Sequence, residues 1–301
     1  MNQKLNELIS LIENANKQYR IGKPIMSDKE YDSLLDELNL LDSTNPVFNT
    51  IGFQVSDDRK SKLPIIMASM NKEKSVIDIL KWARLKSIDL DSEVILTPKY
   101  DGLSLCVDEK NQFCWTRGDG IYGQKSNEHY KLIENKLQNN EIFKFTYGEV
   151  IMPKKVFLEK YSEEFANPRN LVAGLLNSKD PSESLKDCLY IKYGGINDVK
   201  LTSKKEIIDS LNQNQTIKVQ YEVVKISEIS EELLISLFKK WSQEFEIDGI
   251  IIEVNNLSKQ LELGRDESSN NPQYAIAFKS EAFEQSAETE RSEEHTSELQ
   301  S

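Results

Sequence analysis

Hydrophobic residues near the N-terminus recur every three or four positions, which is the spacing of one face of a helix. They form two sets: Leu5, Leu8, Ile9 and Ile12, then Tyr31, Leu34, Leu35 and Leu38. Between the sets, Ser27 and Glu30 have the Ser-x-x-Glu pattern of a capping box, which begins a helix. Residues 1–43 are therefore predicted to form a helical hairpin, and the polar residues 44–62 a linker.

The pattern changes after Glu93, where short runs rich in β-branched and aromatic residues alternate irregularly with helical spacing. The runs predicted as strands are 93–99, 103–109, 112–118, 143–152, 187–195, 217–226, 248–256 and 274–280. Helices are predicted around 75–87 and 231–244. Short hairpin turns between the runs indicate a mixed α+β domain with a mainly antiparallel sheet, rather than a parallel doubly wound sheet.

Composition narrows the class of protein. The chain has 301 residues, of which 38 are basic and 50 acidic, with a net charge of −12. Its length predicts about two domains at roughly 150 residues each. The acidic balance argues against strong nonspecific binding to nucleic acid by this chain alone. No apolar run suits a membrane span or a signal peptide, so we expect a cytoplasmic protein without membrane contact.

Cysteine and histidine offer little chemistry. Cys106, Cys114 and Cys188 form no Cys-x-x-Cys pair, which excludes a disulfide framework and a four-cysteine zinc site. Residues 291–301, RSEEHTSELQS, match the in-frame translation of a common sequencing-library adaptor; the alternative is an acidic, serine-rich tail. We exclude this segment from fold reasoning. His129 is then the one histidine left, so catalysis by a Ser-His-Asp triad is not expected.

The sharpest chemical feature is Lys99-Tyr100-Asp101-Gly102, at the junction of two predicted strands. Partial burial of a lysine among apolar strand residues favours the neutral amine, whose lone pair is a nucleophile. The alternative is a solvated lysine beside an Asp-Gly hairpin turn. Neither usual nucleotide motif, G-x-G-x-x-G or G-x-x-x-x-G-K-[ST], is present.

Further motifs follow Lys99 in a fixed order. They are Thr116–Gly120, Tyr147–Val150, Phe165–Asn170, Tyr193-Gly194, Ile247–Ile252 and Ala277–Lys279. In order and spacing, this set resembles the nucleotidyltransferase (adenylation) domain of the NAD-dependent DNA ligases. The N-terminal hairpin, with Tyr19, Pro24 and Ser27–Asp32, resembles the module of that family that binds nicotinamide mononucleotide. The resemblance runs from about residue 5 to residue 280.

The resemblance implies a domain order and a reaction. A helical module and linker would occupy residues 1–60, a ligase-type nucleotidyltransferase domain unrelated to ATP-grasp 61–281, and the start of an oligonucleotide-binding barrel 282–290. Lys99 would attack the α-phosphate of NAD, release nicotinamide mononucleotide and form lysyl-AMP. The AMP would then pass to a DNA 5′-phosphate for nick sealing. The resemblance implies nicked duplex DNA as partner, bound through domains outside this chain, and we expect a monomer.

The resemblance also assigns residues. Lys99, Asp101, Glu149 and Lys279 are the expected catalytic residues, with Asp101 and Glu149 expected to bind Mg²⁺. The residues expected to bind NAD are Tyr19, Asp28, Tyr31, Asp32, Thr97, Gly102, Arg117, Arg169, Tyr193 and Glu253. Each has a structural alternative. Arg117 can be a surface residue of a hairpin, and Glu149 can face solvent from a strand. Arg169 can be a solvated residue at the start of a helix. Tyr193 and Tyr31 can be packing residues of the core.

Four positions depart from the family pattern: Thr97 stands where the family has Glu, Glu253 where it has Lys, Asn177 near a usual Arg, and Gln18 in an aromatic pair. One hypothesis is that Thr97 and Glu253 exchange roles, with Glu253 accepting a hydrogen bond from the exocyclic amine of adenine. The competing hypotheses are a catalytically degenerate interaction scaffold and an ATP-dependent polynucleotide ligase or capping-type nucleotidyltransferase, which share Lys-x-Asp-Gly.

Overall fold

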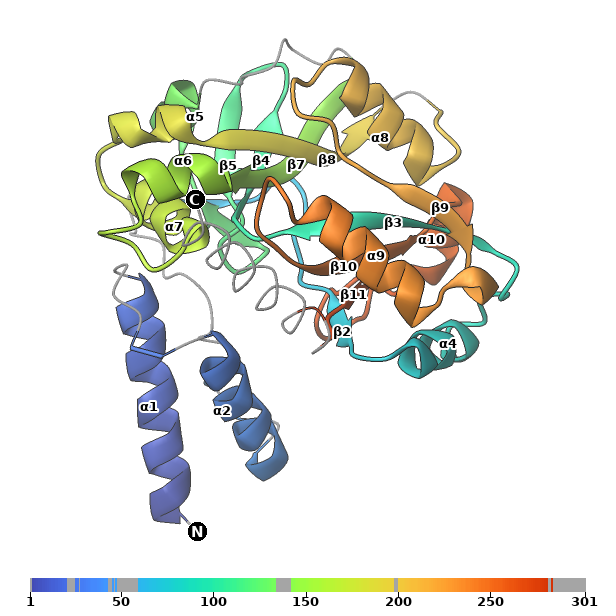
Figure 1. Ribbon diagram of the computed structural model, residues 1–301, viewed down its shortest axis with the longest axis horizontal. Helices are drawn as coiled ribbons and strands as arrows, with labels where there is room; N and C mark the ends of the chain where they lie inside the picture. Colours follow the sequence, from blue (N-terminus) through green and yellow to red (C-terminus); the bar gives the residue numbers. More distant parts are fainter. Residues whose placement is uncertain are drawn as a thin grey trace, which may run out of the picture.

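The N-terminal segment forms the predicted helical hairpin. The computed structural model describes residues 2–20, 25–26, 28–42, 45, 47, 59–133, 142–197, 200–280 and 283. Helix α1 (Asn2–Arg20) pairs with helix α2 (Asp28–Leu41) (Figure 1). Leu8, Ile12 and Leu38 are buried between the helices, as their spacing predicts. An ion pair of 2.8 Å between Lys4 and Glu37 joins the start of α1 to the end of α2, so the helices are antiparallel.

The rest of the described chain is built on two main sheets (Figure 1). The five-stranded sheet has the order β2 (Asn71–Glu73), β11 (Ala275–Phe278), β10 (Ile247–Val254), β3 (Glu93–Tyr100) and β9 (Glu222–Lys225). The four-stranded sheet has the order β5 (Phe113–Thr116), β4 (Leu103–Asp108), β7 (Phe143–Ile151) and β8 (Leu189–Asn197). Every pair in them is antiparallel except β2 with β11. The predicted α+β class with mainly antiparallel sheets is confirmed.

Smaller elements complete the framework. Strands β1 (Lys60–Lys62) and β6 (Tyr122–Gln124) form a two-stranded sheet. The remaining helices are α4 (Val76–Leu85), α5 (Asn127–Leu132), α6 (Lys154–Lys160), α7 (Pro168–Asn177), η1 (Glu183–Asp187), α8 (Lys204–Gln213), η2 (Ile226–Glu228), α9 (Glu231–Trp241) and α10 (Leu257–Leu263). No helix of the described segments is both long and apolar enough to cross a membrane.

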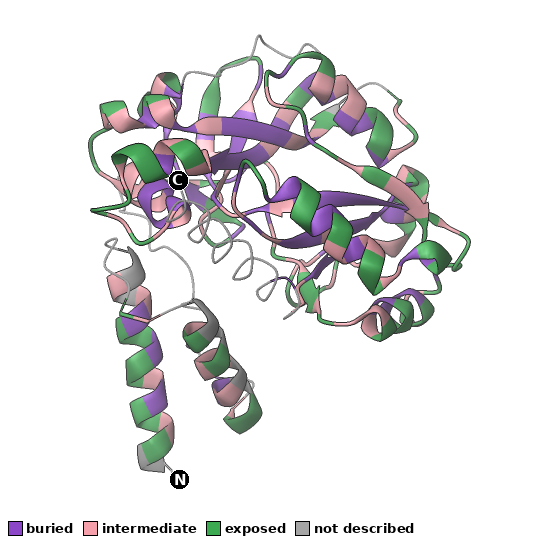
Figure 2. Cartoon of the chain, in the orientation of Figure 1, coloured by how far each residue is buried: buried purple, intermediate pink, exposed green. Residues whose placement is uncertain are grey.

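Each main sheet has its own core. The apolar faces of α4 and α9 pack on the five-stranded sheet through Ile79, Trp82, Leu234 and Trp241. Helices α5, α6 and α7 pack on the four-stranded sheet, with Leu171 and other residues of α7 fully buried. Figure 2 shows the strands of both sheets mostly in the buried colour. The helices predicted from spacing around 75–87 and 231–244 are thus confirmed as α4 and α9.

The predicted strand over 217–226 is shorter than the pattern indicated. Only Glu222–Lys225 form β9. The backbone of Val219 is bound instead by the Asn212 side chain, which accepts from its N–H at 2.9 Å and donates to its carbonyl at 3.0 Å. A side-chain amide thus satisfies backbone groups that a strand would have paired. Ser27, residues 284–301 and the side chains of Tyr19, Asp28 and Asp32 lie outside the described residues.

A buried ion pair joins β8 to the end of β4. Lys192 lies 2.7 Å from Glu109, and each side chain is only 3% exposed. Thr146 of β7 donates a hydrogen bond to the same carboxylate. Removing one partner of a buried pair leaves an uncompensated charge, which costs more than replacing both partners.

We therefore predict that Lys192→Met lowers the free energy of unfolding by about 3–5 kcal/mol. The double variant Lys192→Met/Glu109→Gln, which keeps an acceptor for Thr146, should regain at least half of that loss. Urea denaturation of both variants measures the difference. Lys155→Met removes an exposed pair with Glu159 and should change stability by no more than about 1 kcal/mol. Equal losses in the single and double variants would contradict the prediction.

Candidate active site

The turn at Asp101 and Gly102 connects β3 to β4 and so joins the two main sheets. The Asp101 N–H donates to the Glu246 carbonyl at 2.9 Å. A Cβ atom added at Gly102 would lie 2.0 Å from the Val150 carbonyl oxygen, a distance that no real Cβ contact allows. Glycine at this position therefore lets the backbone pass directly against β7. The structure gives Gly102 a packing role beside its expected role in cofactor binding.

Two lysines share one carboxylate at this junction. The Lys99 Nζ lies 2.8 Å from Oδ1 of Asp248, and the Lys279 Nζ lies 2.7 Å from its Oδ2. Burial by itself raises the pKa of Asp248, but the two ammonium groups outweigh burial and hold this pKa below its ordinary value. Lys99 is therefore an ion-paired, partly exposed side chain and not an isolated buried amine.

Asp248 is not among the predicted site residues, although it lies in the Ile247–Ile252 motif. It is the one charged residue in that otherwise apolar run at the start of β10, and a lone charge in such a run is the sequence feature that could have identified it. Lys279 follows β11 directly, and its N–H donates to the Glu73 carbonyl at 2.9 Å. The pairing of β10 with both β3 and β11 brings the three side chains together.

Glu149 lies on the four-stranded sheet and faces this group. Its Oε2 accepts hydrogen bonds from Ser104 at 2.8 Å and from the Tyr193 hydroxyl at 3.1 Å. Burial raises the pKa of Glu149, while the Ser104 hydrogen bond and the charges of Lys99 and Arg169 act in the opposite direction. Glu149 is thus a buried residue and not a solvent-facing carboxylate, and Tyr193 has a polar contact beyond packing.

Asp101 and Arg169 form a second charged contact of the site. The Arg169 Nη1 donates to Oδ1 of Asp101 at 2.5 Å. Arg169 lies in the first turn of α7, which begins after Asn167, whose side chain accepts from the Asn170 N–H. The cap and the proline at the helix start fix the direction of this turn. Arg169 is therefore a paired residue and not a freely solvated one.

Arg117 contacts a different part of the chain. Its Nε donates to the Met67 carbonyl at 2.8 Å, and its Nη2 donates to the Ser69 hydroxyl at 2.6 Å. The turn after it uses two glycines at positive φ, Gly118 and Gly120. In this structure, Arg117 attaches the segment before β2 to the hairpin of β5 and β6.

Thr97 and Glu253 share one face of the five-stranded sheet. Thr97 pairs with Ile251, and Glu253 is two positions further along β10, so their side chains point to the same side as Lys99. Glu253 does not stand alone. Its Oε2 lies 3.0 Å from Lys204 Nζ, and its Oε1 accepts from the Gln260 amide at 3.0 Å. No pattern in the sequence points to Lys204, because the docking of α8 beside Asn255 is what brings it to Glu253.

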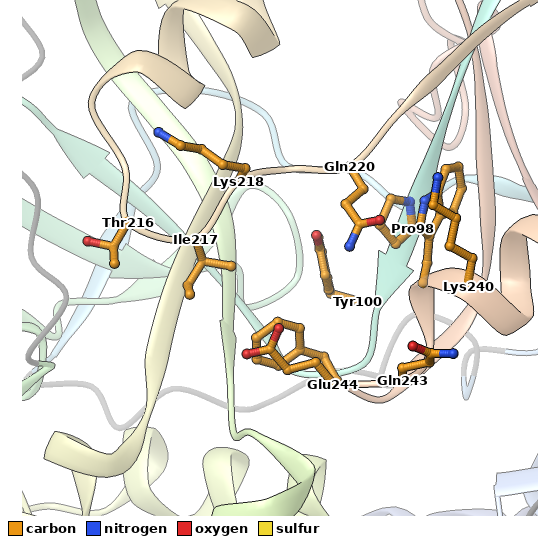
Figure 3. A pocket seen from close by; sticks show the side chains of 11 residues that line it. Pro98, Tyr100, Thr216, Ile217, Lys218, Gln220, Lys240, Gln243 and Glu244 are labelled. Carbon is orange, nitrogen blue, oxygen red and sulfur yellow. The ribbon is translucent and has the colours of Figure 1, made fainter.

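A pocket of about 360 Å³ lies on the other face of β3 (Figure 3). Its lining includes Pro98 and Tyr100, which alternate with Lys99 along the strand and therefore point away from the Lys99 side. Lys218, Lys240 and Glu244 complete a mostly polar rim. We take the lysine–carboxylate group on the opposite face as the candidate site, because the reactive side chains gather there.

The remaining predicted residues are only partly described. Tyr31 is half-buried and packs against the hydrophobic core of the α1–α2 hairpin. Asn177, near a usual family arginine, accepts a hydrogen bond at its carbonyl from Arg59 at 3.2 Å. Among the described residues, no group of three or more His, Cys, Asp or Glu side chains has the geometry to hold a metal ion.

Comparison with known proteins identifies the family of this chain. A family model described as the NAD-dependent DNA ligase adenylation domain matches residues 58–283. A DNA ligase of Acanthamoeba polyphaga mimivirus is 32% identical over 272 residues, which cover 87% of this chain and 40% of the relative. A DNA ligase of Bacillus cytotoxicus is 31% identical, covering 94% of this chain and 46% of the relative. The chain therefore spans less than half the length of these relatives.

Similarity to solved structures is weaker. A structure of an archaeal ATP-dependent RNA ligase has a TM-score of 0.41 and 9% sequence identity, covering 73% of this chain and 49% of its own. A similarity at this level supports no conclusion about function.

The close passage at Gly102 gives a prediction for stability. We expect Gly102→Ala to lower the free energy of unfolding by at least about 1–3 kcal/mol, because the added methyl group meets the β7 backbone. Gly174→Ala is the matched control, since its Cβ would meet only Phe165 at 3.9 Å within a helix. It should raise stability by about 0.4–1 kcal/mol. Urea denaturation compares the two, and equal stability would contradict the packing role of Gly102.

Proposed function

The chain belongs to the NAD-dependent DNA ligase family, and from this we propose that it transfers AMP from NAD to Lys99. The Lys99 amine would attack the α-phosphorus of NAD, and the bond from that phosphorus to the bridging oxygen would break. Nicotinamide mononucleotide leaves with that oxygen. The Lys99 ammonium gives one proton to solvent before the attack, and its nitrogen gives a second proton to solvent as the lysyl-AMP bond forms. The observation that supports this proposal is that Lys99 and Lys279 share Asp248, because the proposed nucleophile then has a second cation next to it.

Lys279 and Asp248 have complementary roles in this proposal. The Lys279 ammonium would neutralise charge on the phosphate oxygens during transfer, where positioning and electrostatics supply most of the catalysis. Because its pKa is lowered, the Asp248 carboxylate is a weak base and a poor acceptor for the Lys99 proton. Its role is therefore to hold the two lysines in place until the phosphates of NAD replace it as their partner.

Asp101 and Glu149 are the proposed ligands of Mg²⁺. This ion usually keeps several waters and is bound through one or two carboxylates together with substrate phosphates. Asp101 in the turn after β3 and Glu149 on β7 would supply these two carboxylates. The described residues contain no group of three or more candidate metal ligands, so the remaining ligands would be waters and phosphate oxygens. When bound, Mg²⁺ would neutralise negative charge on the phosphates. Arg169, paired with Asp101, would hold a phosphate or sugar oxygen through its planar donor fork.

The other proposed contacts divide NAD between its two halves. Tyr19, Asp28, Tyr31 and Asp32 of the hairpin are proposed to hold nicotinamide mononucleotide. Tyr193, Thr97, Glu253, Gly102 and Arg117 are proposed to hold the adenosine half. Tyr193 is supported by the Glu149 hydrogen bond and by an edge-on contact of 5.7 Å with the Tyr147 ring.

Nick sealing is a proposal for the whole protein. The relatives are named DNA ligases and are more than twice the length of the matched region. We propose nicked duplex DNA as the final substrate, a monomeric and cytoplasmic protein, and self-adenylation as the step that this chain performs.

The reaction is tested by incubating the chain with Mg²⁺ and NAD or ATP, each labelled in its adenylate phosphate. We expect denaturing gels to show label from NAD alone, and peptide mapping to find it on Lys99. Lys99→Ala should reduce labelling to background, because Lys99 is the only lysine of the described residues that pairs with Asp248 besides Lys279. Lys155→Ala, which removes a lysine 86% exposed at its side chain, is the control and should label like the parent.

Other outcomes separate the alternatives. Label from ATP but not NAD would favour an ATP-dependent ligase or a capping-type enzyme. No label from either nucleotide, with a normal unfolding transition, would favour a catalytically degenerate scaffold.

The hydrogen bond from Ser104 to Glu149 predicts a pH effect. The proposed metal contact needs ionised Glu149, and Ser104 lowers the pKa of this carboxyl against the effect of burial. Ser104→Ala should therefore raise the Glu149 pKa and move the acidic limb of the self-adenylation rate to higher pH. Ser236→Ala on α9, whose hydroxyl donates only to Leu233, should leave the profile unchanged. A rate change without a shift of the acidic limb would argue against this role of Ser104.

A further inference from the structure

Strand β10 departs from regular alternation where it passes between β3 and β11 (Figure 1). In a regular strand, every second side chain points to the same face of the sheet. The residues of β10 that belong to the core of the five-stranded sheet are Ile247, Ile250, Ile252 and Val254. They are two positions apart except at the first step, which spans three. Asp248 and Gly249 are the two residues within that longer step.

Strand pairing shows the same extra residue. The two pairs on either side of the step are Ile247 with Tyr100 and Ile250 with Pro98. Asp248 and Gly249 on β10 therefore lie opposite the single residue Lys99 on β3. Two residues opposite one form a β-bulge, which bends the strand and increases its twist. Because a bulge redirects side chains, it decides where the Asp248 carboxylate points.

Gly249, the second residue of the bulge, has no room for a side chain. A Cβ atom added there would lie 2.5 Å from the Phe278 carbonyl oxygen and 3.2 Å from Cγ of Lys279. The first distance is shorter than any ordinary contact of a Cβ atom, so β11 would have to move away from β10. The end of β11, and with it Lys279, can approach β10 closely because position 249 is glycine.

The two lysines converge on Asp248 beside this close approach. The Lys99 Nζ lies 2.8 Å from Oδ1 and 3.0 Å from Oδ2 of Asp248. The Lys279 Nζ donates to Oδ2 at 2.7 Å. The lysines reach this carboxylate from opposite neighbours of β10, one from β3 and one from the residue after β11. A methyl group at position 249 would therefore displace Lys279 from Asp248 and from Lys99.

We propose that Gly249 is a positioning residue for AMP transfer. The bulge directs Asp248 toward Lys99, and the absence of a side chain at position 249 lets Lys279 reach the same carboxylate. Gly249 contacts no reacting atom in this scheme; it sets the distance between the nucleophile and the second cation. Charges that are held in place before the reaction stabilise its transition state most effectively. This inference rests on the proposed function, because it concerns the same site.

The test is Gly249→Ala, which adds one methyl group and no charge. We measure the rate of lysyl-AMP formation as a function of NAD concentration. The maximal rate should fall by at least about 10-fold, while the NAD concentration for half-maximal labelling should change by less than about 3-fold, because the displaced cation acts on the reacting phosphate. In a chain that already carries Lys279→Ala, the same substitution should lower the rate by no more than about 2-fold further.

A second measurement does not depend on the reaction. The Asp248 carboxyl carbon is titrated by NMR; the charged groups that face it are Lys99 and Lys279, in contact, and Glu149 on β7. Both ammonium groups lower the Asp248 pKa. Loss of the Lys279 contact should raise this pKa by at least about one pH unit in Gly249→Ala. A glycine with only a structural role would leave the pKa unchanged.

Gly195→Ala on β8 is the matched control. Its Cβ would lie 2.6 Å from the Phe143 ring, so it also creates a collision within a sheet. It should lower stability and leave the labelling rate and the Asp248 pKa at the parental values. Urea denaturation identifies any variant that fails to fold. If Gly249→Ala fails to fold, Lys279→Ala takes its place in the titration, where the Asp248 pKa must rise; an unchanged pKa would overturn the proposal.

The outcomes are distinct for the two proposals. In a folded Gly249→Ala chain, a parental labelling rate or an unchanged Asp248 pKa would overturn the positioning role while leaving AMP transfer intact. A loss of rate in the Lys279→Ala background as large as in the parent would also overturn it, because Gly249 would then act without Lys279. No labelling of the parent, with an Asp248 pKa that Gly249→Ala raises, would reject AMP transfer and support the positioning of the three charges.

Discussion

The contact between Gly102 and the backbone of β7 is the constraint on which the site depends. A side chain at this position would collide with the Val150 carbonyl oxygen and push the turn between β3 and β4 away from β7. Because glycine permits the contact, the chain leaves β3 at Tyr100, the residue after Lys99, and enters β4 at Leu103, the residue before Ser104. The nucleophile candidate and the residues that face it thus follow from one close passage of the backbone.

The site is arranged as balanced pairs of charge. Lys99 and Lys279 face Asp248, Arg169 faces Asp101, and Lys204 faces Glu253. Each carboxylate compensates cations that would otherwise repel one another in a partly buried space. The overall acidity of the chain is consistent with this local balance.

Much of the fold followed from periodicity. Helical spacing identified α1, α2, α4 and α9, and alternating short runs identified most strands of the two sheets, because amphipathic patterns reflect which face is buried. The run at 217–226 was the exception, since Asn212 binds the backbone of Val219 in place of a neighbouring strand. The order of motifs also predicts that Lys99, Glu149, Lys279 and Tyr193 share one site.

The fold class, the family and the candidate nucleophile can be predicted from the amino-acid sequence, because local spacing and motif order are properties of the chain alone. The partners of these residues depend on the tertiary structure. Ser104 contacts Glu149 through strand pairing, Asp248 bridges two lysines from separate strands, and Lys204 reaches Glu253 through the docking of α8. These contacts join residues far apart in the chain, and their geometry depends on sheet register and helix packing, which a one-dimensional pattern does not specify.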